Sequence, residues 1–108
     1  MVTARMPQPE ADDPVSIDSR HYTVEFENEK VRVLRIKYGP GEKSTMHSHP
    51  ESVSVFLTDP NAKFTYPDGH SENLNASAGT VMHMDAFTHE PESLSNTPFE
   101  IIQVELKG

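Results

Sequence analysis

The sequence predicts an all-β domain, either a sandwich or a barrel of short strands. Runs rich in β-branched and aromatic residues recur along the chain, and Gly, Pro, Asn and Asp separate them. No segment shows the 3.6-residue hydrophobic period of an amphipathic helix, and no internal repeat is visible. Eight or nine short strands with regular turns are typical of a sandwich or a barrel.

The first twenty residues differ from the rest of the chain. They contain three prolines and four acidic residues without hydrophobic periodicity. We therefore expect residues 1–20 to form a flexible or arm-like segment without a core of its own. A chain of 108 residues fits one domain, which we assign to residues 21–108.

Three strands are expected in the first half of this domain. The segments 21–28 and 31–38 are rich in β-branched and aromatic residues. In the second segment apolar and charged residues alternate, which is the period of a half-buried strand. Val53, Val55 and Leu57 share one face of a third run.

The second half contains a predicted hairpin and a two-faced final strand. Pro67-Asp68-Gly69 separates two polar strands, and such a turn uses the fixed φ of Pro and the positive φ open to Gly. The last run, residues 98–107, has apolar residues on both faces. A homodimer contact would bury the second face, and the low apolar fraction of 34% supports the same expectation.

Charge and composition exclude several kinds of partner and site. Seventeen acidic against nine basic residues give a net charge of −8, which repels nucleic acids and anionic membranes. The chain has no cysteine, so disulfides, thiolate nucleophiles and cysteine metal sites are excluded. Neither a membrane-spanning run nor a signal-peptide core is present, and we expect a soluble cytoplasmic protein.

His47 and His49 form the clearest candidate site. They lie two residues apart in a predicted strand, so both imidazoles project to the same side and offer two nitrogens to one metal. The alternative is a pair of solvated surface histidines that binds nothing.

A third ligand has to come from elsewhere in the chain. The candidates are His21, His70, His83 and His89. We expect His70, beside the Pro-Asp-Gly turn, to be exposed, and His21 to lie at the edge of the polar tail. His83 and His89 bracket a bend between two strands, and spacing alone does not choose between them.

The pattern of glycines and histidines resembles the two motifs of the cupin family. Gly41, His47 and His49 fit the first motif, G-x5-H-x-H-x3–4-E-x6-G, and Gly79 and His89 fall where the second, G-x5-P-x-G-x2-H-x3-N, is expected. The resemblance covers about three quarters of the chain. It implies an antiparallel jelly-roll barrel with a metal held inside by histidines of both motifs.

The first motif lacks its glutamate and its closing glycine. The glutamate falls at position 53 or 54, where this chain has Val53 or Ser54. Strand parity predicts that Val53 shares the face of His47 and His49 and fills the place of a fourth ligand, unless Pro50 shifts the register.

The second motif is altered as well. Asp85 stands in place of Pro, Phe87 in place of Gly, and His89 comes one residue early. Small bacterial cupins often carry P-A-x-T-H in this segment, and residues 85–89 resemble that version at Ala, Thr and His. On this resemblance we prefer His89 to His83 as the third ligand.

The resemblance therefore implies a three-histidine site, His47, His49 and His89, for one divalent metal. Fe, Mn, Zn, Ni and Cu all accept neutral imidazoles, and two or three positions stay open for water and substrate. Glu51 shares strand parity with the pair and is a weak candidate for a fourth ligand or catalytic base; a solvated loop residue is the alternative reading.

Other residues are expected around this site. One of the acids that flank the third histidine is a candidate to accept an imidazole N–H. These acids are Asp85, Glu90 and Glu92. A further set of side chains is expected to make the cavity apolar or simply to pack in the core. They are Met46, Met82, Met84 and Phe87.

Two classes of function follow. The first is a metalloenzyme acting on a small oxygen-bearing substrate, with dioxygenase-like oxidation first and Lewis-acid isomerase or lyase chemistry second. The second is a non-catalytic metabolite-binding or sensing module. Fold resemblance does not decide between them, because cupins host many unrelated chemistries.

Overall fold

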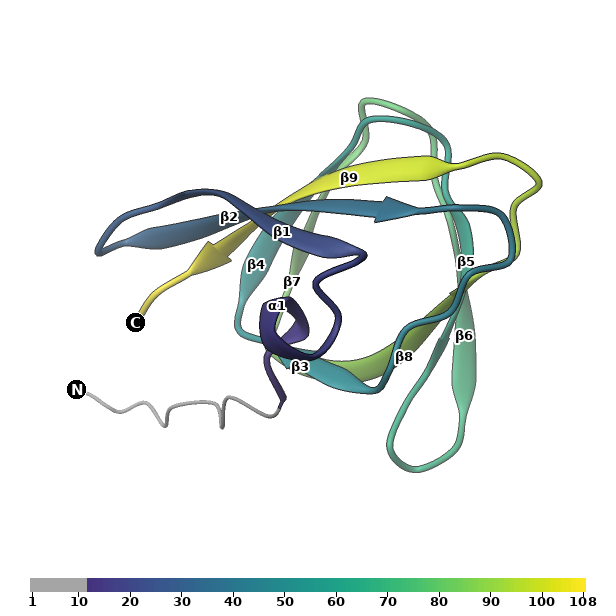
Figure 1. The fold of residues 1–108 in the computed structure, drawn as a ribbon, viewed down its shortest axis with the longest axis horizontal. Helices are drawn as coiled ribbons and strands as arrows, with labels where there is room; N and C mark the ends of the chain where they lie inside the picture. The colour runs from purple at the N-terminus through teal and green to yellow at the C-terminus, as the bar shows by residue number, and fades with distance from the viewer. Residues whose placement is uncertain (1–11) are drawn as a thin grey trace.

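The structure, a computed structural model, describes residues 12–108. In this part of the chain nine strands and one short helix form two antiparallel sheets that close around one interior (Figure 1). The predicted all-β antiparallel barrel is confirmed. Residues 1–11, the first part of the predicted arm, lie outside the described residues.

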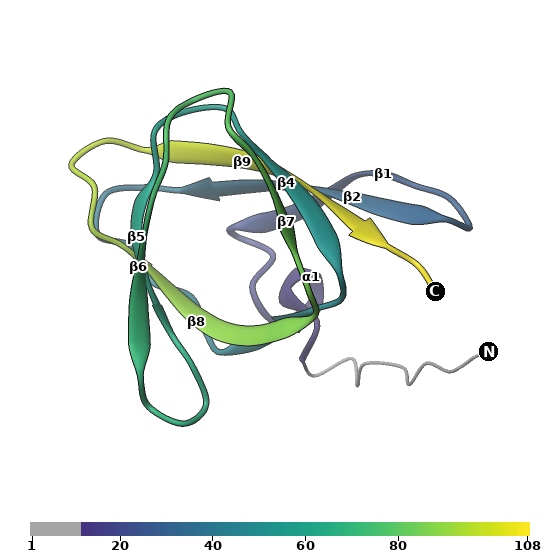
Figure 2. The same ribbon diagram turned by 180° about the vertical axis from the view of Figure 1, so that it is seen from behind.

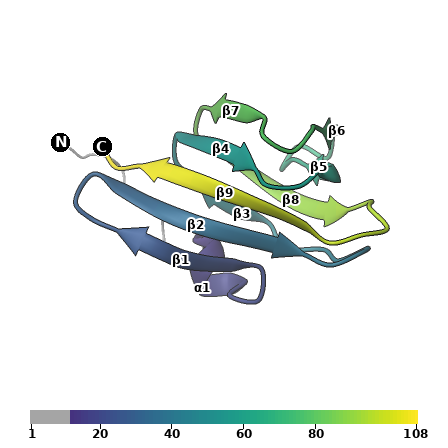
Figure 3. The same ribbon diagram turned by 90° about the horizontal axis from the view of Figure 1, so that it is seen from above.

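The first sheet contains five strands, side by side in the order β1, β2, β9, β4 and β7 (Figure 3). Their bounds are β1 Tyr22–Glu27, β2 Val31–Tyr38, β9 Phe99–Leu106, β4 Ser52–Phe56 and β7 Val81–Met84. The second sheet has the order β3, β8, β5 and β6. Its strands are β3 His47–His49, β8 Phe87–Ser93, β5 Asn61–Thr65 and β6 Ser71–Asn75.

Alternation along the strands decides which side chains enter the core. In β2 the apolar residues Leu34, Ile36 and Tyr38 are buried while Lys37 is exposed, as the period of two predicts. Their partners across the sheet in β9 include the buried Phe99 and Ile101. The apolar core consists of Tyr22, Leu34, Ile36, Tyr38, Phe56, Ala62, Phe99 and Ile101.

The other face of the first sheet is also apolar. Val104 of β9 lies between Val33 of β2 and Val53 of β4, and Ile102 pairs with Val55. These side chains, which we call the outer apolar face, are only half-buried. The final strand therefore carries apolar residues on both faces, as the sequence indicates.

The predicted hairpin forms between β5 and β6, which Figure 2 shows beside β8. Gly69 takes a φ of 93°, the left-handed region that favours glycine. The short helix α1, Pro14–Ile17, packs against β1 and β3, and Asp13 caps it by accepting a bond from the N–H of Val15. Four residues are too few to show a helical period in the sequence.

No helix within residues 12–108 is long and apolar enough to cross a membrane.

Candidate metal centre

Three buried histidines converge inside the barrel. The antiparallel pairing of β3 with β8 sets His47 directly opposite His89, and His49 opposite Phe87. One nitrogen from each of the three rings lies within 4.8 Å of the others. The structure therefore brings His89, not His83, to the His47–His49 pair.

The tautomers of two of these rings are set by hydrogen bonds. The Nδ1–H of His47 donates to the carbonyl oxygen of Thr45 at 2.7 Å, and the Nδ1–H of His49 donates to the carboxylate of Glu105 at 2.9 Å. In a neutral imidazole a proton on Nδ1 leaves a lone pair on Nε2. Both residues are thus prepared to offer Nε2 to a metal.

Glu105 is the buried end of a chain of three charged side chains. Its second oxygen accepts a bond from Nε of Arg32 at 2.9 Å, while the two terminal nitrogens of Arg32 bind both oxygens of Asp13 at 3.0 and 2.7 Å. Burial alone would raise the pKa of Asp13, but the bonds from Arg32 outweigh it and lower that pKa. The residue that caps α1 is therefore linked to His49 through two charged side chains.

The protonation state and the unpartnered nitrogens of two of the three rings fit a divalent metal. Burial lowers the pKa of His47 to about 4, and burial also lowers the pKa of His89. Both rings are therefore neutral at pH 7. Within the described part of the chain, Nε2 of His47 and both ring nitrogens of His89 are buried without a hydrogen-bond partner. Clustered, unpartnered imidazole nitrogens of this kind match the donor set of a metal such as Zn or Fe.

Aromatic side chains hold the histidine rings in place. Phe87 stacks on His49 with 5.2 Å between ring centroids and meets the ring of His89 edge-on at 4.5 Å. Phe64 meets His89 at 4.4 Å, and Tyr22 meets His47 at 4.7 Å. This packing limits rotation of the three ligand candidates.

The other histidines lie elsewhere. His83 is exposed on the outer surface, where its Nε2 lies 2.7 Å from a carboxylate oxygen of the exposed Glu51. Glu51, the weak candidate for a ligand or base, is thus outside the cavity. His70 is exposed beside Asp68, as expected.

His21 has a structural partner set of its own. Its ring is buried and stacked on Tyr38, with Nδ1 2.7 Å from Asp18 and Nε2 3.0 Å from Glu42. Asp18 also accepts a bond from the hydroxyl of Ser44. His21 therefore ties the segment before β1 to the loop before β3 rather than joining the histidine cluster.

The predicted position of Val53 is wrong. In β4 the residues Ser52, Ser54 and Phe56 are buried, whereas Val53 belongs to the outer apolar face. The chain passes from the second sheet to the first between β3 and β4, so strand parity is not carried from His49 to Val53. The glutamate of the first motif was expected at position 53 or 54, and of these two residues it is Ser54 that lines the cavity.

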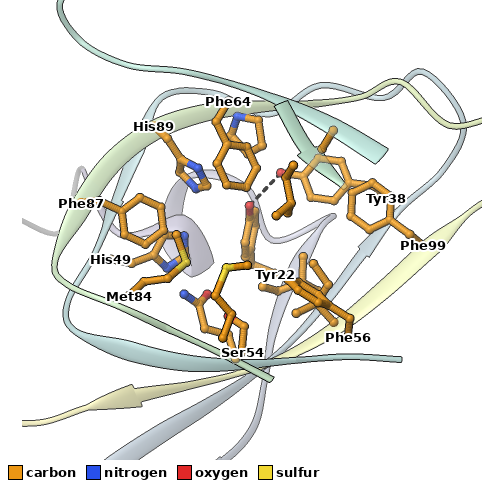
Figure 4. A pocket seen from close by; sticks show the side chains of 17 residues that line it. Tyr22, Tyr38, His49, Ser54, Phe56, Phe64, Met84, Phe87, His89 and Phe99 are labelled. Carbon is orange, nitrogen blue, oxygen red and sulfur yellow. Dashed lines mark hydrogen bonds between the residues drawn. The ribbon is translucent and has the colours of Figure 1, made fainter. Parts of the chain in front are cut away.

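A cavity lies next to the histidines, and Figure 4 shows the side chains around it. Its volume is about 40 Å³, and it is partly open to solvent. His49 and His89 form one wall with Phe87, and Tyr22 stands against the histidines (Figure 4). Met82 and Met84 line it as predicted, whereas Met46 is outside its lining.

Two residues at the site were missed from the sequence. Neither Asp85, Glu90 nor Glu92 supplies the carboxylate that orients an imidazole; Glu105 does. The sequence does contain a signal for Glu105. It is a charged residue at a position of β9 that shares the buried face with apolar residues. Tyr22 carries no comparable signal, because it reads as an ordinary strand residue.

The comparisons with known proteins agree with the expected cupin fold. Neither a family model nor a curated protein matches the sequence. A solved cupin domain from Bordetella pertussis Tohama I is 26% identical with a TM-score of 0.74, over 81% of this chain and 92% of that one. A protein with a double-stranded β-helix domain from Klebsiella pneumoniae is 20% identical with a TM-score of 0.64, over 81% and 76% of the two chains. Oxalate decarboxylase from Bacillus subtilis is 20% identical with a TM-score of 0.55, over 71% of this chain and 22% of that one.

Proposed function

We propose that this chain, a small cupin-family domain, holds one divalent transition metal with His47, His49 and His89 beside a cavity for a small ligand. The observation that carries the proposal is the convergence of three buried imidazoles, each offering one nitrogen within 4.8 Å of the other two. Buried nitrogens without partners are costly, and metal coordination removes that cost.

We propose an oxidative, dioxygenase-like activity as the reaction. A redox-active metal such as iron, when bound, supplies the centre at which dioxygen and an organic substrate react, with both oxygen atoms entering the substrate. The chain's own part is to hold the three rings in fixed tautomers, to bind the substrate body and to exclude water.

The composition of the cavity supports this choice over isomerase or lyase chemistry. Within residues 12–108, no carboxylate and no lysine lines the cavity, so a dedicated proton-abstracting base is missing there. Burial raises the pKa of Tyr22, which keeps its hydroxyl protonated at neutral pH. The alternative function is a non-catalytic module that binds or senses a metabolite in the same cavity.

Metal content tests the site. Protein purified without a histidine tag should contain about one metal per chain, and His47→Ala and His89→Ala should lose it while keeping the strand signal in circular dichroism. His70→Ala is the matched control, because it removes an exposed histidine that lies away from the cavity. Stoichiometric metal in both cavity variants would exclude the proposed site.

Oxygen consumption separates the two functions. The iron-loaded protein should take up oxygen with a small neutral substrate, and the uptake should disappear in His47→Ala but persist in His70→Ala. Ligand binding without any oxygen uptake, across iron and manganese forms, would favour the binding module.

We propose a homodimer that buries the outer apolar face. Val104 lies at its centre, between Val33 and Val53. Val81 and Phe26, at 63% and 54% exposure, extend the same sheet face to its edges. Light scattering should give twice the mass of 12.1 kDa at micromolar concentration, and Val104→Lys should give one chain mass. A monomeric parent protein would contradict the proposal.

The division into an arm, residues 1–20, and a barrel, residues 21–108, stays a proposal. The described part of the arm is attached to the barrel, since Asp13 binds Arg32 and Asp18 binds His21. Limited proteolysis should therefore leave residues 12–20 uncut while the barrel is folded.

A further inference from the structure

The wall of the cavity is suited to an uncharged ligand. Within the described residues, no Lys, Arg, Asp or Glu lines it, and most of its surface is aromatic or aliphatic (Figure 4). Its polar residues are Tyr22, Tyr38, His49, Ser54, His89 and Gln103. Apart from a metal on the histidines, nothing in this lining would offer an opposite charge to a charged ligand body, which would lose its hydration there.

The two tyrosines are hydrogen-bonded to each other. Their hydroxyl oxygens are 2.7 Å apart, which is the hydrogen bond drawn in Figure 4. Burial raises the pKa of both phenols, so neither becomes an anion at neutral pH. They form a neutral polar wall in which the hydroxyl that accepts keeps its own hydrogen for a further acceptor.

Gln103 differs from the tyrosines. Its side chain is 3% exposed, and its Nε2 donates to the hydroxyl of Ser52 at 2.9 Å. Its Oε1 is buried and has no partner within the part of the chain that the structure describes. This amide oxygen has two lone pairs and no hydrogen-bond donor beside it. Its burial without a partner costs free energy, and a ligand that donates a hydrogen bond to it would remove that cost.

The position of Gln103 relates it to the histidine cluster. It lies on β9 two residues before Glu105, so both side chains face the interior, and it is the direct partner of Ser54 on β4. Glu105 holds His49, and therefore Gln103 belongs to the same wall as the metal site. Met82, the other partner of Ser54, is a flexible side chain that can make room for a ligand.

We propose that the cavity binds a small, neutral, mainly apolar molecule that carries an N–H or O–H donor, and that Oε1 of Gln103 accepts this hydrogen bond. The proposal rests on the proposed function in that the same cavity receives the substrate. It names the class of ligand and assigns Gln103 as the residue that determines specificity.

Pyrrole and furan test the donor requirement. They are neutral five-membered rings of nearly equal size, and only pyrrole carries an N–H. In NMR titrations of the parent protein, pyrrole should bind about tenfold tighter than furan, because a buried acceptor is satisfied by one and left unpaired by the other. Pyrrole-2-carboxylate, the charged analogue, should bind more weakly than pyrrole to the metal-free protein.

Gln103→Met tests the residue. Methionine keeps the length of the side chain without the amide oxygen, so the ratio of the furan to the pyrrole dissociation constant should fall to about one. Ser54→Ala is the matched control, since it removes a neighbouring polar group from the same cavity and should keep the preference. The comparison of the two rings in the parent protein needs no variant and stands even if Gln103→Met folds poorly.

Equal binding of both rings, tighter binding of furan, or no binding of either ring would overturn the proposal. Metal content, measured on the same samples, separates this result from a failure of the proposed function. Full metal occupancy without a preference for pyrrole refutes the role of Gln103 alone. A preference for pyrrole in a protein that retains no metal refutes the metal site and supports the role of Gln103.

Discussion

Replacement of Glu105 by glutamine tests how the barrel prepares His49 for a metal. One carboxylate oxygen accepts from His49 Nδ1 and the other accepts from Arg32 Nε, both at 2.9 Å. A glutamine has one oxygen and one NH2 group, so it cannot accept from both partners. If its NH2 faces His49, the ring has to move its proton to Nε2, the nitrogen needed for the metal.

The expected loss follows from these contacts. Glu105→Gln removes one of two hydrogen bonds to a charged carboxylate, each of which contributes about 1.5–3 kcal/mol. Because Arg32 keeps both bonds to Asp13, the loss falls mainly on His49. Metal affinity should therefore decrease about 10- to 100-fold, the usual effect of removing a group that orients a ligand histidine.

Competition titration with a chromophoric Zn²⁺ chelator measures this change. Glu100→Gln is the matched control, since Glu100 lies on the same strand, pairs with Arg35 outside the barrel and changes the net charge equally. The control should keep its affinity within about twofold. Equal affinities for both variants and the parent protein, with both variants folded by circular dichroism, would refute the reasoning.

Three further predictions concern single residues. Val53→Glu should leave the Mn²⁺ affinity unchanged within about twofold, because Val53 faces outward. Ser54→Glu should raise the Mn²⁺ affinity, because it adds a carboxylate to the inner wall. Mn²⁺ titration of both variants measures these affinities. Burial opposes ionisation of Asp18, but hydrogen bonds from Ser44 and His21 outweigh it and lower the pKa of Asp18 from 3.8. Its stabilising contribution is therefore present above pH 3.8 and is lost as the pH falls through the folded-state pKa. In urea unfolding between pH 2 and pH 5, the free energy of unfolding should fall less steeply with decreasing pH in Asp18→Asn than in the parent protein. His21→Ala should lower the free energy of unfolding by about 2–3 kcal/mol with metal content unchanged, because two carboxylates lose their partner outside the histidine cluster; loss of metal in this variant would contradict the assignment.

Some features of this protein are local in origin, and the sequence determined them. The alternation in residues 31–38, the turn at Gly69 and the common face of His47 and His49 follow from short-range backbone geometry. A period of two and the φ freedom of glycine act over a few residues, so they are readable without a fold.

Only the tertiary structure decided which distant residues complete the site. Spacing along the sequence does not choose between His83 and His89, and only the cupin resemblance favours His89. The β3–β8 register sets His89 opposite His47, while the β4–β7 register sets His83 opposite Val53 on the outer face. Glu105 reaches His49 from a strand fifty-six residues away. The alternation of side-chain direction holds within one strand, but it is not carried over where the chain passes from one sheet to the other. The contacts across the barrel depend on how the two sheets close.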